Sequence, residues 1–91
     1  MINITGYEII GKIYESHISE IYRAVRHEGK DPVILKLHAK KHPEPQEIAQ
    51  YKNEYRIART LQGLPGVIQV HGLEKYQNGL VLITEDIQGE S

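Results

Sequence analysis

The sequence of 91 residues contains no cysteine, no tryptophan and no phenylalanine. Without cysteine the chain can form neither a disulfide framework nor a thiolate metal site, which is typical of proteins in a reducing cytoplasm. Tyrosine supplies all six aromatic side chains other than histidine, so isoleucine, leucine and valine must build most of the core. No apolar run approaches the length of a membrane span, and the first residues lack the pattern of a secretory signal. We therefore expect a cytoplasmic protein without a membrane partner.

A large excess of charge of one sign is also absent. The chain has 11 basic and 12 acidic side chains and a formal net charge of -1, so its overall charge gives no attraction to nucleic acid. A chain of this length buries only about two thirds of its unfolded surface on folding and has room for one core. We predict a single domain over residues 1–91.

Three segments in the first half of the chain have the composition and alternation of β-strands. They are Tyr7–Tyr14, Glu20–His27 and Val33–His38. Short polar turns connect them, and the turn before the third segment contains Gly29 and Pro32. Sequential strands joined by short turns are expected to pair in antiparallel fashion.

A helix is predicted from Gln46 to Leu61, because Pro45 and the acidic residues beside it are typical of a helix start. Gly63 follows as a stop signal. Two more strands are predicted, Val67–Glu74 and Leu80–Glu85. Asn78-Gly79 between them indicates a hairpin turn. The sequence therefore predicts an α+β fold, in which a five-stranded antiparallel sheet packs with one long helix inserted between the third and fourth strands.

Lys36 is an unusual residue in the third predicted strand. Ile34 and Lys36 share one face of this strand, whereas Val33, Leu35 and Leu37 share the other. An ammonium group is thus placed in the middle of an otherwise apolar strand. Considered alone, the strand favours a lysine whose stem lies along the sheet while its head reaches water.

Glu54 changes that interpretation, because it lies at the centre of the apolar face of the predicted helix. Its neighbours within about 60° on this face are Tyr51, Ile57, Ala58 and Leu61. Lys52, Arg56 and Arg59 lie on the opposite side and are expected to be solvated. A carboxylate that points into a core is costly unless a cation meets it. We therefore predict that Glu54 pairs with Lys36.

A strand with a central lysine, a helix with an inward glutamate and the surrounding order of strands resemble the N-terminal lobe of protein kinases. Val33-Ile34-Leu35-Lys36 is similar to the Val-Ala-Ile-Lys motif, with Ile34 in place of alanine. Other matching segments are Glu54-Tyr55-Arg56-Ile57 with Leu61, Gly66-Val67-Ile68, and Leu82-Ile83-Thr84-Glu85-Asp86. The resemblance covers the chain from Tyr7 to Ser91.

More closely, the chain resembles the divergent serine/threonine-kinase-like domain at the N-terminus of large bacterial multi-domain sensor proteins. The segments that carry this resemblance are Ile13-Tyr14-Glu15-Ser16, Pro32-Val33-Ile34-Leu35-Lys36, Leu73-Glu74-Lys75-Tyr76-Gln77-Asn78 and Glu85-Asp86. In such proteins ATPase, GAF and histidine kinase modules follow. The resemblance therefore implies a role in signal transduction, with a C-terminal kinase lobe and downstream sensor domains as partners.

The resemblance also implies an ATP site. Lys36, paired with Glu54, would reach the α and β phosphates. Ile21 and Ile34 would form the roof over adenine, and Thr84 would be the gatekeeper. The backbone of Glu85 and Ile87 would hydrogen-bond the base. The remaining implied nucleotide-binding residues are Ile13, Ser16 and Ser19.

The loop that would cover the phosphates lacks the glycines of the family. Tyr14, Ser16 and Ser19 stand at the three positions, where glycine permits positive φ and lets backbone amides approach the phosphates closely. Ser16 and Ser19 are small and keep hydroxyl or amide donors, whereas Tyr14 is the larger departure. These residues are compatible both with a loop that covers ATP less well and with a polar turn that binds no ligand.

Kinases also need aspartates that hold magnesium and orient the acceptor hydroxyl. This sequence has two aspartates, Asp31 in a predicted turn and Asp86 in the apparent hinge, and no His-Arg-Asp or Asp-Phe-Gly segment. Magnesium would be held mainly by the C-terminal lobe, so the chain alone is predicted to be inactive and to bind ATP weakly. His38 and His42 lie four residues apart beside prolines and are not predicted to bind a metal.

Three functional hypotheses follow from the sequence. The first is the ATP-binding lobe of a serine/threonine kinase-like domain. The second is a non-catalytic, pseudokinase-like interaction or regulatory module, which the missing glycines favour. The third is an unrelated α+β adaptor in which Lys36 and Glu54 form only an ion pair. In each lobe hypothesis we expect weak self-association through the face near Ile34, Thr84 and Ile87.

Overall fold

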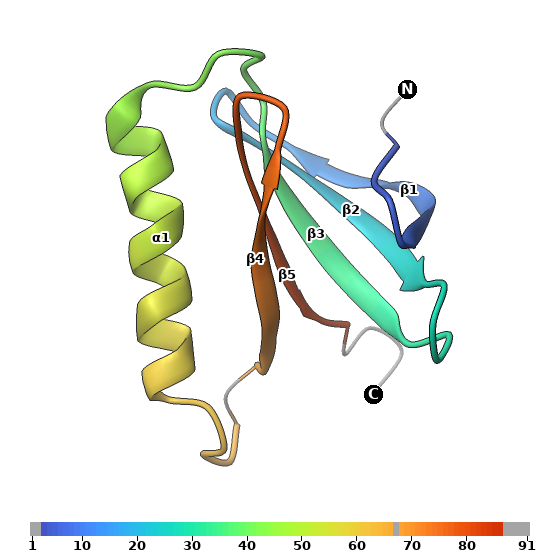
Figure 1. Ribbon diagram of the computed structural model, residues 1–91. Helices are drawn as coiled ribbons and strands as arrows, with labels where there is room; N and C mark the ends of the chain where they lie inside the picture. Colours follow the sequence, from blue (N-terminus) through green and yellow to red (C-terminus); the bar gives the residue numbers. More distant parts are fainter. Residues whose placement is uncertain (1–2, 67, 87–91) are drawn as a thin grey trace.

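The computed structural model describes residues 3–66 and 68–86. Its elements follow one another as β1 (Tyr7–Glu15), β2 (Ser19–Arg26), β3 (Pro32–His38), α1 (Pro45–Thr60), β4 (Val70–Tyr76) and β5 (Gly79–Glu85) (Figure 1). The strands form one five-stranded sheet in the order β1-β2-β3-β5-β4, and all neighbouring pairs are antiparallel. The predicted α+β class, with one helix between the third and fourth strands, is confirmed.

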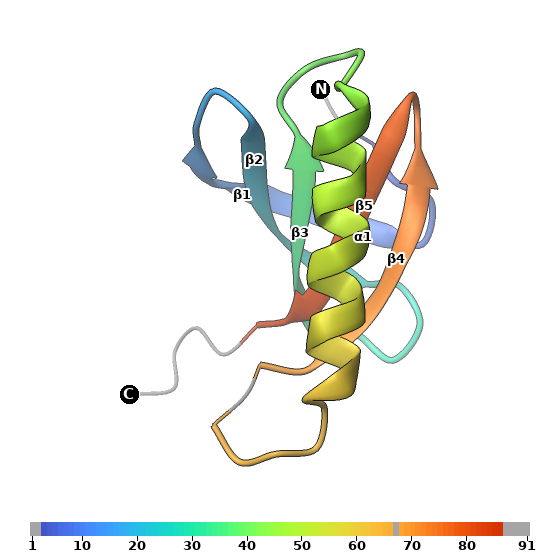
Figure 2. The same cartoon turned by 90° about the vertical axis from the view of Figure 1, so that its left-hand side faces the viewer.

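The helix packs on one side of the sheet, in front of β3, β4 and β5 (Figure 2). Side chains alternate between the two faces of a strand, and directly opposite residues on neighbouring strands share a face. We call the side that α1 covers the helix face and the other side the core face. The helix face carries Ser19, Ile21, Arg23, Ile34, Lys36, His38, Leu82 and Thr84.

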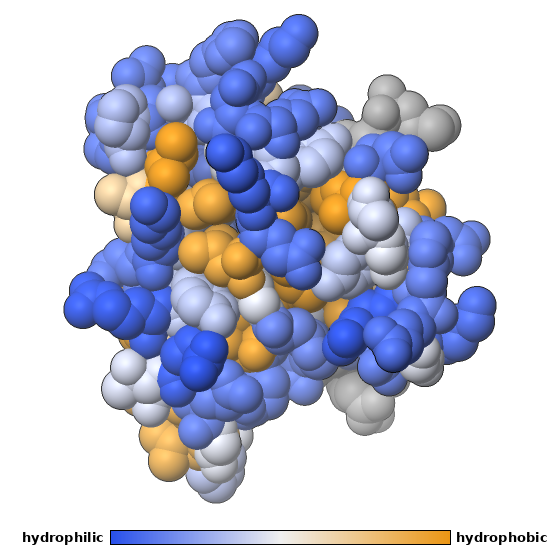
Figure 3. Space-filling model, viewed as in Figure 1, coloured by the Kyte–Doolittle hydropathy of each residue, from blue (hydrophilic) through white to orange (hydrophobic). Residues whose placement is uncertain are grey.

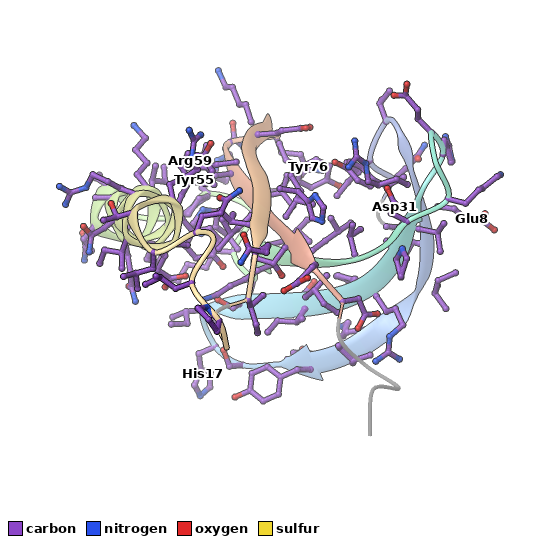
Figure 4. All side chains as sticks on the ribbon, turned by 90° about the horizontal axis from the view of Figure 1, so that it is seen from below. Glu8, His17, Asp31, Tyr55, Arg59 and Tyr76 are labelled. Carbon is purple, nitrogen blue, oxygen red and sulfur yellow. The ribbon has the colours of Figure 1, made fainter. Side chains whose placement is uncertain are left out.

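The hydrophobic core lies on the core face, away from α1. It consists of Ile4, Ala24, Val33, Leu35, Leu37, Val81 and Ile83, with Tyr7, Ile9, Tyr22 and Tyr76 packed against it. The sheet is strongly curved, and Tyr76 lies on its concave side (Figure 4). Register shifts between Ile9 and Gly11 and between Lys12 and Tyr14 interrupt the pairing of β1 with β2. Such bulges bend a strand and increase its twist, which helps β1 to follow the curved sheet.

The start of α1 is capped, and one side of the helix packs on the sheet. Pro45 occupies the first turn, and the Glu44 N–H donates a hydrogen bond of 2.9 Å to Glu47 Oε1. Tyr51 is the one residue of α1 that is buried. Ile57, one residue of the predicted apolar stripe, is 50% exposed. Ile48, Glu54 and Ala58 on the same side of the helix are half-buried. The helix α1 is not long and apolar enough to cross a membrane.

Several predicted boundaries differ from the observed ones. The helix begins and ends one residue earlier than predicted, and β4 begins at Val70 rather than at Val67, which lies outside the described residues. The hairpin turn between β4 and β5 consists of Gln77 and Asn78, because Gly79 already pairs with Tyr76 as the first residue of β5. The Asn78-Gly79 pair thus predicted the position of the hairpin correctly, but the two turn residues lie one position earlier.

Candidate functional site

The Lys36 ammonium group and the Glu54 carboxylate meet on the helix face, as predicted. Lys36 Nζ lies 3.0 Å from Glu54 Oε1 and 3.2 Å from Glu54 Oε2. The lysine projects from the central strand β3, and the glutamate projects from the middle of α1. Their side chains are 29% and 33% exposed. The pair therefore lies at a partly open boundary between helix and sheet rather than deep in a core.

Tyr51, one turn before Glu54, fixes α1 to the sheet beside this pair. Its hydroxyl donates a hydrogen bond of 2.9 Å to the Leu37 carbonyl and lies 2.7 Å from Ser19 Oγ, which is placed to donate to it. Lys36 Nζ lies 5.2 Å from the centre of the Tyr51 ring, a distance at which a cation is attracted to an aromatic face. Burial raises the pKa of the Tyr51 phenol. Sequence analysis placed Tyr51 on the right face of the helix but gave it no role.

The imidazole of His38 packs against the Tyr51 ring. The two rings stack with centroids 4.0 Å apart and planes inclined by 19°. Neither nitrogen of His38 has a hydrogen-bond partner among the described residues. Desolvation by burial lowers the pKa of His38. The negative charge of Glu47 raises this pKa, and the positive charge of Lys36 lowers it further, with a net lowering. A small cavity of about 20 Å³ adjoins the imidazole, between the residues that follow β3 and the β4–β5 hairpin.

In the loop between β1 and β2, backbone amides form hydrogen bonds with groups of the same loop. The Ser16 N–H donates to the Ser19 carbonyl at 2.8 Å. The hydroxyl of Ser16 accepts hydrogen bonds from the amides of Ile18 at 3.3 Å and Ser19 at 3.2 Å. These three amides already have partners inside the loop. The Ser16 oxygen thus occupies the space toward which the amides of Ile18 and Ser19 converge.

The segment that ends β5 is tied down by side chains on both of its sides. Glu85 Oε2 accepts a hydrogen bond of 2.8 Å from the Gln69 amide, and the Glu85 amide donates to the Gln69 carbonyl at 2.9 Å. Asp86 Oδ2 accepts a hydrogen bond of 3.0 Å from Nε of Arg23 on β2. Sequence analysis did not foresee this pairing, because 63 residues separate the two side chains.

The structure brings three further predicted site residues, Ile21, Ile34 and Thr84, to the same face of the sheet as Lys36. Ile21 lies opposite Lys36 on β2, and Ile34 lies opposite Thr84 on β5. All of them are half-buried on the helix face.

The remaining predicted site residues are placed differently. Ser19 is 5% exposed and faces Tyr51 instead of the loop surface. Ile13 lies at the irregularity of β1 and is 46% exposed. Ser16 bonds within its own loop, and the amide of Glu85 bonds to Gln69. Ile87 lies outside the described residues.

The described part of the chain holds no group of three or more histidine or acidic side chains arranged to bind a metal ion. The comparisons with known proteins were also negative. No protein-family model matches the chain, and no curated protein matches it.

Proposed function

We propose that the chain is the ATP-binding lobe of a serine/threonine protein kinase-like domain in signal transduction, and that it is not catalytically competent by itself. The observation that carries this proposal is the ion pair between Lys36 on the third strand and Glu54 on the helix. The order of elements along the chain, β-β-β-α-β-β, is the order that the resemblance implies.

The pair is suited to hold a phosphate group. Lys36 has three N–H donors and two contacts with Glu54, so a donor remains for a phosphate oxygen. Glu54 keeps the ammonium group in one place, and the partial exposure of the pair leaves it accessible from solvent. Ile21 and Ile34 offer apolar surface beside it, on which a base would lie.

Binding by this chain alone is expected to be weak. The amides of Ser16, Ile18 and Ser19 are already bonded within their loop, so they give no cradle for the phosphates unless the loop rearranges. In the proposal a C-terminal lobe supplies the second wall of the pocket, together with the aspartates that hold magnesium and orient the acceptor hydroxyl.

The same loop geometry favours a second candidate function, a non-catalytic regulatory or interaction module of the pseudokinase kind. A closed loop stabilises the sheet and leaves the Lys36–Glu54 pair as a structural link between α1 and β3. The two candidates differ in whether ATP binds at Lys36.

NMR titration of amide signals with Mg-ATP tests the proposal. We expect saturable shifts at Ile21, Ile34 and Lys36 on the helix face, with a dissociation constant of about 1 mM or weaker for the chain alone. Lys36→Met keeps the stem but removes the ammonium group, and should weaken binding by about tenfold or more.

Lys12→Met is the matched control, because Lys12 lies opposite Tyr22 on the core face and pairs with Glu15 at 2.9 Å. Equal losses in the two variants, or shifts spread over the core face, would contradict the proposed site. Low-micromolar binding that Lys36→Ala abolishes would instead show that the lobe alone forms a full site, and would overturn the expectation of weak binding.

A further inference from the structure

The side chains of Arg23 and Asp86 form an ion pair that spans the helix face at the end of β5. Arg23 Nε lies 3.0 Å from Asp86 Oδ2. The carboxylate side chain is only 5% exposed and the arginine side chain is 29% exposed. The contact is therefore largely withdrawn from water, unlike the ion pair of Arg26 with Asp31 on the other face of β2, in which the aspartate is 57% exposed.

The sheet register requires the Arg23 side chain to lie across β3. Arg23 pairs with Ile34, and Ile34 pairs with Thr84, so the three residues form one row on the helix face. Asp86 follows β5 two residues after Thr84. Since neighbouring strands are about 4.8 Å apart, an arginine on β2 reaches a residue beyond β5 only by crossing the strand between them. The residue of that strand that stands beside Arg23 in the row is Ile34.

On its other side Arg23 faces a residue without a side chain. Gly11 of β1 is its partner in the ladder, and a Cβ atom at Gly11 would meet no other atom within 4 Å. The helix face is thus open beside Arg23 on the β1 side. The guanidinium nevertheless turns the opposite way, across β3 and toward Asp86.

We infer that Arg23, held by Asp86, is an internal competitor for the base of the nucleotide and that the pair sets the apparent affinity of the site. This inference rests on the proposed function, in which Ile34 forms the roof over the base and Thr84 lies beside it. A base can reach Ile34 only after the arginine side chain has moved away. The apparent affinity is therefore the intrinsic affinity multiplied by the fraction of molecules in which the Arg23–Asp86 pair is open.

Three probes distinguish binding of the base from binding of the phosphates. ATP carries both, adenosine carries the base and inorganic tripolyphosphate carries the phosphates. In NMR titrations of the full chain, Arg23→Ala should bind ATP and adenosine about fivefold to tenfold more tightly than the wild type. It should bind tripolyphosphate no more tightly, because loss of a positive charge cannot strengthen attraction to an anion.

Asp86→Asn is the second variant, since it weakens the pair and leaves the arginine in place. It should also raise the affinity for adenosine, by a smaller factor than Arg23→Ala. Arg26→Ala is the matched control, because it removes the same charge from the same strand on the opposite face and should leave all three affinities unchanged. The amide spectrum of each variant reports whether it is folded.

The outcomes distinguish the competitor from the proposed function. If the wild type binds ATP and Arg23→Ala binds adenosine with the same or a lower affinity, the role of Arg23 as a competitor is overturned. The proposed nucleotide site is retained in that case. Equal gains for adenosine and tripolyphosphate would also overturn it, because they would indicate a general loosening of the protein. Absence of ATP binding in the wild type and in both variants would overturn the proposed function and the competitor together.

Discussion

At the scale of single residues, Tyr51 connects the candidate site to the sheet. Its hydroxyl bonds to Leu37 and Ser19, one side of its ring stacks on His38, and Lys36 lies near its ring. The helical periodicity of the sequence identified Tyr51 as a residue that faces inward. It could not identify these partners, because Ser19 lies 32 residues away and its position depends on the register between β2 and β3.

The environment of His38 predicts an acid-sensitive contribution to stability. Its pKa is lowered in the folded state, so on acidification the unfolded chain takes up the proton first. The contribution is thus fully present above the unfolded pKa of about 6.5 and is lost as the pH falls below it. The free energy of unfolding should fall by at most about 1.4 kcal/mol per pH unit from this group.

Urea unfolding at pH 7.5 and pH 5.5 measures this effect. His38→Phe keeps a ring against Tyr51 but cannot titrate, so its stability should depend less on pH than that of the wild type. The carboxylate of Glu47 lies near His38, and its pKa is lowered because it accepts a hydrogen bond from the Glu44 amide. Titration of Glu47 therefore changes the stability at a lower pH than titration of His38. Identical pH dependence in the wild type and in His38→Phe would contradict the prediction.

At the scale of elements, the sequence predicted which segments are strands and helix more reliably than how they are arranged. Alternation assigned Val33, Leu35 and Leu37 to one face of β3, and all three are buried on the core face. The Lys36–Glu54 contact followed from the cost of an unpaired charge. The pairing of Arg23 with Asp86 depends on β5 lying beside β3, which local patterns do not specify.

The β4–β5 hairpin gives a prediction at this scale. An added Cβ atom at Gly79 would overlap Cδ2 of His38 and lie 2.9 Å from Cγ of Pro43. His38 is held by its stacking on Tyr51 and Pro43 is rigid, so neither can easily move aside. Gly79→Ala should lower the free energy of unfolding by about 1–3 kcal/mol, measured by urea denaturation.

Gly72→Ala is the matched control, since an added Cβ atom at Gly72 in the neighbouring strand would meet nothing within 4 Å. Its effect should stay within about 0.5 kcal/mol. Equal destabilisation by the two substitutions would indicate a general effect of strand glycines and not a close approach at His38.

At the scale of the whole molecule, exposed apolar side chains gather where α1 leads into the loop before β4. Ile57, Leu61, Leu64 and Ile68 are between 41% and 53% exposed. Figure 3 shows apolar atoms at the lower end of the molecule, where this segment lies in the view of Figure 1. Ile34 and Thr84, where sequence analysis expected a self-association surface, are half-buried and therefore less exposed than these four side chains. The expectation of weak self-association through the face near Ile34, Thr84 and Ile87 stays a prediction. The end of α1 is a second and more exposed apolar region through which copies could associate.

Sedimentation equilibrium at increasing protein concentration checks this prediction. The wild type should associate weakly, and replacing Leu61 and Leu64 together by lysine should restore a monomer. Ile10→Lys is the control, because Ile10 is 58% exposed on β1 and lies outside this region. A wild type that stays strictly monomeric, or loss of association in Ile10→Lys alone, would contradict the placement.

The irregular pairing at both borders of the sheet has a consequence for the size of any assembly. The pairing of β1 with β2 shifts at two places, and that of β4 with β5 shifts between Val70 and Gly72. A further strand needs a regular row of unpaired amides and carbonyls to continue a sheet, and bulges interrupt such a row. Association of this chain should therefore close at a small number of copies and not grow into fibres.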